Sequence, residues 1–308
     1  MSLRARRLLF VTGKGGVGKT TVAAALARSL ADEGKSVWLC SVDDRPDLAK
    51  AFNLPSLTFE PTAVDERLSV SVMDTESALR EYLSLFVKLP FVTKLGPFAA
   101  ALDFVATAAP GVREILTVGK ICYEVRERHY DVVVVDAPAT GHLPGYLATP
   151  QTINALVSVG LLRGQSNWMR ALLTDAAVTG VVAVTTPEEM PVRETRSLLD
   201  ALADTSGVDV AAVVVNKMPP PVVPSRLVAR ASELVTTRRD AFTHAGVEAV
   251  AVAAEVALTR RREAESAFAL LGELIPEHAP VLQPLLFHCD RAPEIVTAIA
   301  ASLGQELS

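Results

Sequence analysis

The chain has 308 residues, half of them hydrophobic, and a net charge of −5. This length suits one large α/β domain, alone or with an inserted subdomain. The sequence contains no run of about 18 uninterrupted apolar residues, so we expect no transmembrane helix and no stable membrane insertion. The first apolar run is too short for a signal peptide, which predicts a cytoplasmic protein. The acidic balance argues against a protein that coats nucleic-acid phosphates.

Short apolar runs alternate with helical patterns along the chain. Strands are predicted at residues 8–11, 37–42, 68–72, 130–135, 178–185 and 208–215. Helices are predicted at residues 19–32, 188–206 and 225–245. This alternation predicts an α/β fold, a doubly wound and mostly parallel sheet with helices on both faces.

Two regions depart from this plain alternation. Residues 75–128 hold three helical patches and no convincing strand, and residues 142–175 are also expected to be helical. We therefore predict a single domain spanning residues 1–308, with an inserted helical subdomain built from these two segments. Residues 247–254 alternate like a strand but lie within a helix-rich stretch, and periodicity alone does not decide between the two.

A glycine-rich loop joins the first strand to the first helix. Residues 13–20 read Gly-Lys-Gly-Gly-Val-Gly-Lys-Thr, the P-loop pattern in its required context. The glycines let backbone N–H groups turn inward around an anion, and the helix N-terminus adds positive charge. Lys19 would reach the β- and γ-phosphates, and the Thr20 hydroxyl would bind the Mg²⁺ that bridges them. The predicted site for ATP and Mg²⁺ comprises Gly13, Lys14, Gly15, Gly16, Val17, Gly18, Lys19, Thr20 and Thr21.

The extra lysine of this loop, Lys14, is informative. With it the loop resembles that of the deviant P-loop family, which includes partition ATPases, nitrogenase reductase, arsenite-pump ATPases and tail-anchored-protein-targeting ATPases. In that family this lysine crosses a dimer interface to the partner's nucleotide. The resemblance therefore implies that Lys14 is catalytic in trans, as an arginine finger is.

Asp136 ends an apolar strand, at the edge where doubly wound folds bind ligands. The segment from Asp136 to His142 resembles Asp-Thr-Ala-Pro-Thr-Gly-His of the arsenite-pump and targeting branch, with Ala137 and Pro138 as departures. The resemblance implies that Asp136 holds Mg²⁺ and that Gly141 senses the γ-phosphate. A strand-terminal Asp can also be a turn cap.

Asp43 ends the second strand, where the family reads Asp-Pro-Ala-His-Ser. The resemblance implies that Asp43 is catalytic, polarising the attacking water, and that it joins Thr20 and Asp136 around Mg²⁺. This chain has Arg45 and Pro46 in place of the family's small and histidine residues, which leaves the hydrolysis rate open.

Asn216 ends the strand at 208–215, and its amide offers both a donor and an acceptor for an adenine edge. The family reads adenine with an Asn at this place, although a turn-forming Asn is the alternative. Residues 281–286 resemble the family's late strand and adenine loop, which implies that Pro284 and Leu285 lie beside the base. The same resemblance makes residues 247–254 helical.

The resemblance implies a Mg²⁺-dependent ATPase that drives transport or delivery of an unidentified client. ATP would close a homodimer, or a heterodimer with a paralogue, and hydrolysis would reopen it. Apolar stretches at 83–109 and 161–173 could line a groove for a hydrophobic or membrane-protein client, or could simply close a helical core. The three cysteines, Cys40, Cys122 and Cys289, are far apart and read as buried thiols rather than a metalloid site.

Two other functions remain open. The protein could be a nucleotide-gated binding module that hydrolyses little ATP, because the segment after Asp43 is altered. It could also be a partition or Min-type ATPase. The net charge of −5 and the Thr140-Gly141-His142 sequence disfavour action on DNA, and the absence of Lys and Arg from residues 293–303 disfavours a membrane-binding helix.

Overall fold

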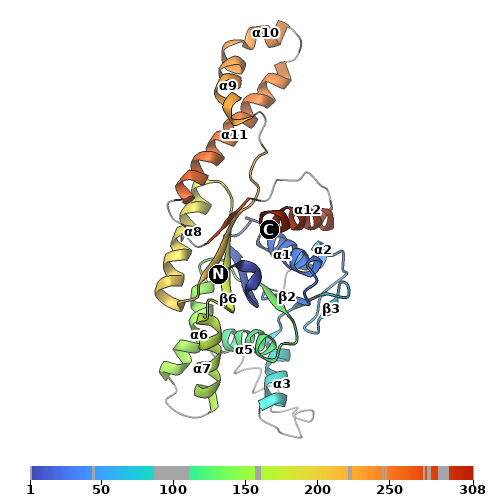
Figure 1. The fold of residues 1–308 in the computed structure, drawn as a ribbon, viewed down its shortest axis with the longest axis vertical. Coiled ribbons are helices and arrows are strands. Elements are labelled where there is room, and N and C mark those ends of the chain that lie inside the picture. The colour runs from blue at the N-terminus through green and yellow to red at the C-terminus, as the bar shows by residue number, and fades with distance from the viewer. Residues whose placement is uncertain are drawn as a thin grey trace.

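The structure is a computed structural model with a β-sheet at its centre, against which the helices of the body pack (Figure 1). It describes residues 2–43, 46–86, 111–156, 161–220, 224–244, 246, 248–272, 275, 279–283 and 291–307. The strands are β1 Leu8–Gly13, β2 Val37–Ser41, β3 Thr62–Ala63, β4 Leu68–Val72, β5 Val132–Asp136, β6 Thr179–Thr185, β7 Val210–Val215 and β8 Val281–Leu282. Their order is β3-β4-β2-β5-β1-β6-β7-β8.

Every neighbouring pair of strands is parallel except β3 and β4, so the predicted α/β fold with a mostly parallel sheet is confirmed. The central strands are buried on both faces, which explains why they read as continuous apolar runs rather than alternating ones. The predicted strands begin one or two residues early at β5, β6 and β7, because the apolar run continues into the preceding turn.

Helices cover both faces of the sheet (Figure 1). The helices are α1 Lys19–Asp32, α2 Asp47–Ala51, α3 Thr75–Phe86, α5 Val112–Glu127, α6 Leu143–Leu156, α7 Leu161–Thr174, α8 Glu189–Ala201, α9 Val228–Thr237, α10 Arg239–His244, α11 Glu248–Gly272 and α12 Ala292–Glu306. Short 3-10 turns occupy Leu3–Ala5 and Ser225–Leu227, and a π-helical turn, Leu202–Ser206, ends α8. One core packs α1, α2 and α12 on the sheet, and the other packs α5, α6, α7 and α8 on the opposite face.

Helices α3, α5, α6 and α7 gather toward one end of the molecule (Figure 1). They fall within the two segments predicted to form a helical subdomain, 75–128 and 142–175. Residues 87–110 and 157–160 of this region lie outside the described residues, so the subdomain itself stays a prediction. No helix in the described part of the chain combines the length and apolar character needed to cross a membrane.

Helices α9, α10 and α11 form an arm that extends from the opposite end of the body (Figure 1). The residues that alternate like a strand, 248–254, are the first turns of α11, which agrees with the helical assignment implied by the family resemblance. The lower half of α11 contributes Ala264, Ala267 and Leu271 to the main core. Its upper half packs with α9 around a separate small core of Val235, Ala251 and Leu258.

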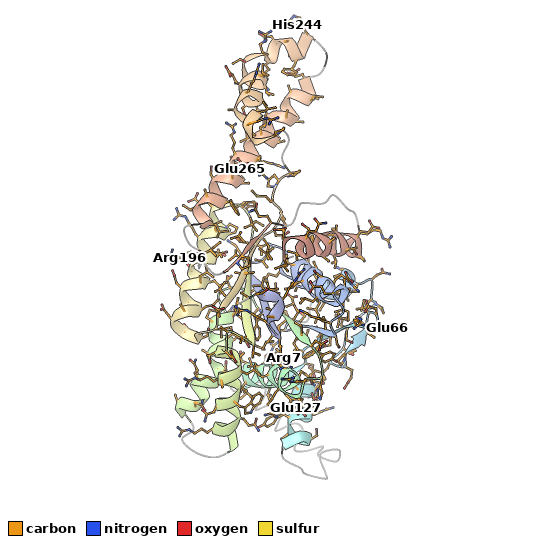
Figure 2. The ribbon with its side chains drawn as sticks, in the orientation of Figure 1. Arg7, Glu66, Glu127, Arg196, His244 and Glu265 are labelled. Carbon is orange, nitrogen blue, oxygen red and sulfur yellow. The ribbon has the colours of Figure 1, made fainter. Side chains whose placement is uncertain are left out.

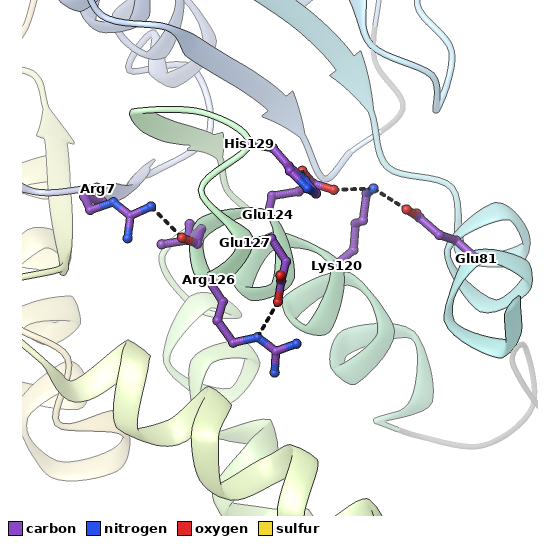
Figure 3. Close-up of polar contacts among 8 residues, drawn as sticks. Arg7, Glu81, Lys120, Glu124, Arg126, Glu127 and His129 are labelled. Carbon is purple, nitrogen blue, oxygen red and sulfur yellow. Dashed lines mark hydrogen bonds and ion pairs between the residues drawn. The ribbon is translucent and has the colours of Figure 1, made fainter. Parts of the chain in front are cut away.

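A buried ionic cluster joins α3 to α5 near the amino ends of the strands (Figure 3). Lys120 Nζ donates to Glu124 Oε1 at 2.6 Å and to Glu81 Oε1 of α3 at 2.7 Å. His129 Nδ1 lies 2.7 Å from the other oxygen of Glu124. Burial alone would lower the pKa of Lys120, but hydrogen bonds and charge attraction from the two glutamates outweigh it and raise that pKa. The ammonium therefore stays charged and ties the two helices together.

We expect the variant Lys120→Met to lose about 3 kcal/mol of unfolding free energy, because it leaves the carboxylate of Glu124 buried without its cation. The urea midpoint measures this loss. The control is Arg196→Met, which breaks the exposed pair with Asp200 and should cost less than about 0.5 kcal/mol. Equal midpoints for the two variants would show that the cluster carries no special stability. Figure 2 shows where Arg196 lies on α8, away from Glu127, an exposed residue next to the cluster.

Candidate functional site

The phosphate loop runs from the end of β1 to the first turn of α1. Gly16 and Gly18 have φ of 87° and 94°, the left-handed region where glycine carries no Cβ penalty. A Cβ on Gly13 would lie 2.2 Å from the Val184 carbonyl oxygen of the neighbouring strand β6. The glycines are therefore required by backbone curvature and by close approach to the sheet, and Lys19 and Thr20 follow in the helix.

Residues after β7 support the outside of this loop. Asn216 Nδ2 donates to the Val17 carbonyl at 2.8 Å, and its Oδ1 accepts from the Lys217 N–H at 2.9 Å. A Cβ on Gly18 would lie 2.4 Å from Asn216 Nδ2. Asn216 is 6% exposed, and its amide keeps one N–H and one lone pair for another partner.

The carboxylate of Asp136 lies against the start of α1. Thr20 Oγ1 donates to Asp136 Oδ2 at 2.8 Å, and Ser41 Oγ donates to the same oxygen at 3.4 Å. The sheet explains this convergence, because Asp136 is level with Ser41 on β2 and with Val11 on β1. Ser41 was not predicted as a site residue, because its place level with Asp136 depends on which strands pair.

Asp136 is nearly buried, and this burial raises its pKa to about 6. The hydrogen bonds from Thr20 and Ser41 and the nearby charge of Lys19 act in the opposite direction, and the charge of Asp43 adds to the increase. Lys19 and Asp43 are therefore both close enough to act on this carboxylate. A carboxylate whose charged form is destabilised by burial is typical of a site that binds a cation.

The oxygen donors at this corner fit Mg²⁺. Thr20 and Asp136 supply a hydroxyl and a carboxylate oxygen 2.8 Å apart, the hard ligands that Mg²⁺ prefers. Within the described ranges, no group of three or more His, Cys, Asp or Glu side chains could hold a metal ion by itself. Such a partial site suits Mg²⁺, which usually binds through one or two protein groups together with phosphate oxygens and water.

The segments that follow Asp43 and Asp136 begin at this corner. Ser41 Oγ also donates to the Asp43 carbonyl at 2.9 Å, which fixes the start of the segment after β2. Asp44 and Arg45 lie outside the described residues. Thr12 Oγ1 donates to the Pro138 carbonyl at 2.7 Å, so the segment after β5 is anchored to the end of β1.

Lys14 has a partner within its own chain. Its Nζ lies 2.6 Å from Glu194 Oε1 on α8, and both side chains are more than one third exposed. The structure thus brings together Lys14, Lys19, Thr20, Asp43 and Asp136 around the phosphate loop, with Thr21 in the first turn of α1 and Asn216 behind. Pro284 and Leu285, predicted beside adenine, lie outside the described residues.

Two of the three cysteines lie within the described part of the chain. Cys40 and Cys122 are buried free thiols whose burial raises their pKa, so they remain protonated. Cys289 lies outside the described residues.

A glycine-rich phosphate loop at the carboxyl edge of a doubly wound parallel sheet, with a strand-end carboxylate bonded to the loop threonine, defines a P-loop ATPase. The sequence model of the anion-transporting ATPase family matches residues 6–167 and 163–234 of this chain. The chain belongs to this family, which includes the arsenical-pump and GET3-type ATPases, and it is an ATP hydrolase of that class.

Its relatives span bacteria and eukaryotes. The chain is 35% identical to ATPase BagA of Mycobacterium tuberculosis over 238 residues, which are 74% of this chain and 69% of BagA. It is 31% identical to a putative arsenical pump-driving ATPase 2 of Aquifex aeolicus over 244 residues, 70% of this chain and 81% of that protein. It is 28% identical to ATPase GET3 of Chaetomium globosum over 252 residues, 70% and 74% of the two chains.

The buried carboxyl of Asp136 predicts a pH-dependent stability. Its pKa is about 6 in the folded chain and 3.8 without burial, so the folded state binds the extra proton between these values. Without nucleotide and Mg²⁺, the contribution of Asp136 to stability should therefore fall as pH rises from about 4 to 6 and stay low above it. The variant Asp136→Asn should lose this dependence and gain on the order of 2–3 kcal/mol at pH 7.5.

Urea midpoints of the parent and the Asp136→Asn variant across pH 4 to 8 measure this difference. The variant Asp131→Asn is the control, since its side chain bonds the exposed Ser36 N–H at another edge of the sheet. A constant difference between the parent and Asp136→Asn at every pH would contradict the assignment of the raised pKa to Asp136.

Proposed function

We propose that this ATPase is Mg²⁺-dependent and uses ATP binding and hydrolysis to switch a dimer between open and closed states, driving transport or delivery of a client. The observation that carries this proposal is the hydrogen bond that joins Thr20 to Asp136 beside Lys19. It brings a metal-binding hydroxyl, a strand-end carboxylate and a phosphate-binding ammonium to one corner. Three such groups in one place suit phosphoryl transfer rather than phosphate binding alone.

The proposed reaction is transfer of the γ-phosphoryl group of ATP to water. When bound, Mg²⁺ would neutralise charge on the β- and γ-phosphates, held by Thr20 and Asp136. Lys19 contacts the same phosphates, and Asp43 orients the attacking water as its oxygen approaches phosphorus. The bond between phosphorus and the ADP oxygen then breaks, and the proton of the water leaves with the products.

The ion pair of Lys14 with Glu194 supports the dimer switch. In the single chain, Lys14 extends from the phosphate loop to α8 and is more than one third exposed. An exposed ion pair of this kind is weak, so a partner's phosphates can replace Glu194 at little cost. We propose that Lys14 leaves Glu194 when two chains close, and then compensates charge on the partner's nucleotide.

The remaining contacts to the nucleotide are proposed by position. Asn216 keeps one donor and one acceptor after supporting the phosphate loop, enough to read one edge of adenine. Pro284 and Leu285 are proposed to pack beside the base. We keep a homodimer and a heterodimer with a paralogue as alternatives, and we place the protein in the cytoplasm, where ATP and Mg²⁺ are available.

The client is proposed to be a hydrophobic segment, as in a membrane protein. The segments 75–128 and 142–175 would form the helical subdomain that receives it, and α3, α5, α6 and α7 lie within them. Nucleic acid is not a proposed partner, because the chain carries a net charge of −5.

A second candidate is a nucleotide-gated binding module that hydrolyses little ATP. The segment after Asp43 favours it, because Pro46 directly precedes α2 and fixes the backbone where a switch would need to move. Hydrolysis rates separate this module from the switching ATPase.

Single-turnover hydrolysis of ATP tests the assigned roles. We expect Lys19→Ala and Asp43→Asn each to lower the rate by about 100-fold or more, with only Lys19→Ala also weakening nucleotide binding. The control is Asp47→Asn, an exposed carboxylate at the start of α2, which should keep the parent rate. A parent rate in Asp43→Asn would remove Asp43 from the reaction, and a very slow parent would favour the binding module.

Dimer formation with a non-hydrolysable ATP analogue tests the exchange of Lys14. We expect Lys14→Ala to abolish the nucleotide-dependent dimer, and Glu194→Gln to strengthen it a few-fold by releasing Lys14. Glu189→Gln, which breaks the exposed pair with Arg193, should leave the dimer unchanged. Analytical ultracentrifugation measures all three, and a weaker dimer in Glu194→Gln would show that this carboxylate serves the interface instead.

A further inference from the structure

Lys217 adopts an uncommon backbone conformation directly after β7. Its φ of 58° lies in the left-handed region, which a non-glycine residue occupies only at a steric cost. In the observed structure its Nζ donates to the Gly16 carbonyl of the phosphate loop at 2.8 Å. A strained residue that contacts the phosphate loop points to a constraint set by function rather than by packing.

The contacts of Lys217 and Asn216 fix how the loop presents its N–H groups. Asn216 bonds the Val17 carbonyl at 2.8 Å while Lys217 bonds the adjacent Gly16 carbonyl at 2.8 Å. In a planar trans peptide the carbonyl and the following N–H point to opposite sides. Holding the Val17 carbonyl on Asn216 therefore turns the Gly18 N–H to the opposite side, toward the place where a phosphate would bind. The Val17 N–H, opposite the Gly16 carbonyl that Lys217 holds, donates to the Lys14 carbonyl at 3.5 Å within the loop.

The segment after β7 that contains Lys217 also contacts the arm. Arg261 Nη1 of α11 donates to the Pro219 carbonyl at 2.7 Å, and Arg261 Nε is held by Glu265 at 2.7 Å. Only one residue, Met218, separates Lys217 from Pro219. A continuous path thus runs from the Gly16 carbonyl through Lys217 and Pro219 to Arg261.

Space for movement lies beside this path. A cavity of about 1440 Å³ is lined by Lys217, Pro219 and Pro220 of the loop and by residues of α11 that include Arg260 and Ala264. The base of α11 is packed in the main core, while its upper half belongs to the separate small core it shares with α9. Because α11 is a continuous helix of 25 residues held at its base, a small displacement at the base becomes a larger one at the tip.

We propose that Lys217 is a positioning residue for the phosphate loop, and that its link through Pro219 to Arg261 couples nucleotide binding to the position of the arm. The proposal rests on ATP binding at the phosphate loop and is independent of the proposed dimer switch. Lys217 acts on the loop backbone, so its removal changes nucleotide affinity without removing a catalytic group. Arg261 acts on the arm alone.

Affinity for a fluorescent ADP tests the positioning role. We expect Lys217→Met to weaken binding about tenfold, the value of one charged hydrogen bond, and Lys217→Arg to restore most of it. Lys217→Gly is the decisive variant, because glycine relieves the left-handed backbone and should melt no lower than the parent, yet it removes the ammonium. We expect it to bind as weakly as Lys217→Met.

The matched control for affinity is Lys50→Met, an exposed lysine on α2, which should bind as the parent does. Parent affinity in Lys217→Gly would overturn the positioning role and leave Lys217 as a turn residue only. If Lys217→Met does not fold, Lys217→Gly and Lys217→Arg still give opposite expectations.

The distance between the arm tip and the body tests the coupling. Spin labels on His244→Cys at the arm tip and on Glu66→Cys at the side of the body, two residues well separated in Figure 2, report it in a chain whose Cys289 is replaced by Ser. Cys40 and Cys122 are buried and remain. We expect ADP and a non-hydrolysable ATP analogue to change the distance distribution in this parent.

We expect Arg261→Met to lose the nucleotide-dependent change in distance while binding ADP within about twofold of the parent. The control is Arg262→Met, the next residue of α11, whose exposed guanidinium lies 3.5 Å from the Thr259 hydroxyl. The change should persist in it. An unchanged distance in the parent, or a full change in Arg261→Met, would overturn the coupling whatever the affinities of the Lys217 variants.

Discussion

The carboxyl ends of β1, β2 and β5 meet at one edge of the sheet, and the candidate site depends on this alignment. Parallel pairing places Asp136 level with Ser41 on one side and with Val11 on the other. The phosphate loop begins two residues after Val11, and its left-handed glycines turn the chain back so that Thr20 reaches Asp136 at 2.8 Å. The close contact of Gly13 with β6 keeps the loop in this place from the other side.

This alignment places the Asp136 carboxylate in a buried position, where the protein alone stabilises its negative charge poorly. Asp136 is 6% exposed, and burial raises its pKa to about 6 despite two hydrogen bonds and a nearby lysine. The corner is therefore more favourable with a cation than without one. The buried charge of Asp136 lowers the stability of the nucleotide-free chain but favours binding of a metal-nucleotide complex. Such a trade-off is common where a binding site is preformed.

Local pattern was enough to predict much of the fold and of the site. Continuous apolar runs marked the strands, and the glycine spacing marked the phosphate loop. Ser41 was missed because a hydroxyl at a strand end looks like any strand residue until the neighbouring strand is known. The Lys14–Glu194 and Lys217–Gly16 contacts join residues 180 and 201 positions apart, a separation that sequence periodicity does not encode. Helices were expected at 225–245 and, from the family resemblance, at 247–254, but their periodicity does not show that they leave the body as an arm with its own small core.

The arm has a further consequence for how the chain unfolds. Three small or medium side chains, Val235, Ala251 and Leu258, form the buried part of its own core, whereas Leu234, Val250 and Val256 are 46–62% exposed. So little buried apolar area holds a helical hairpin only weakly. The amides of α9 and the first turns of α11 should exchange their hydrogens through local opening, well before those of the sheet, so that the tip behaves as a separate unit of low stability on a rigid ATPase body.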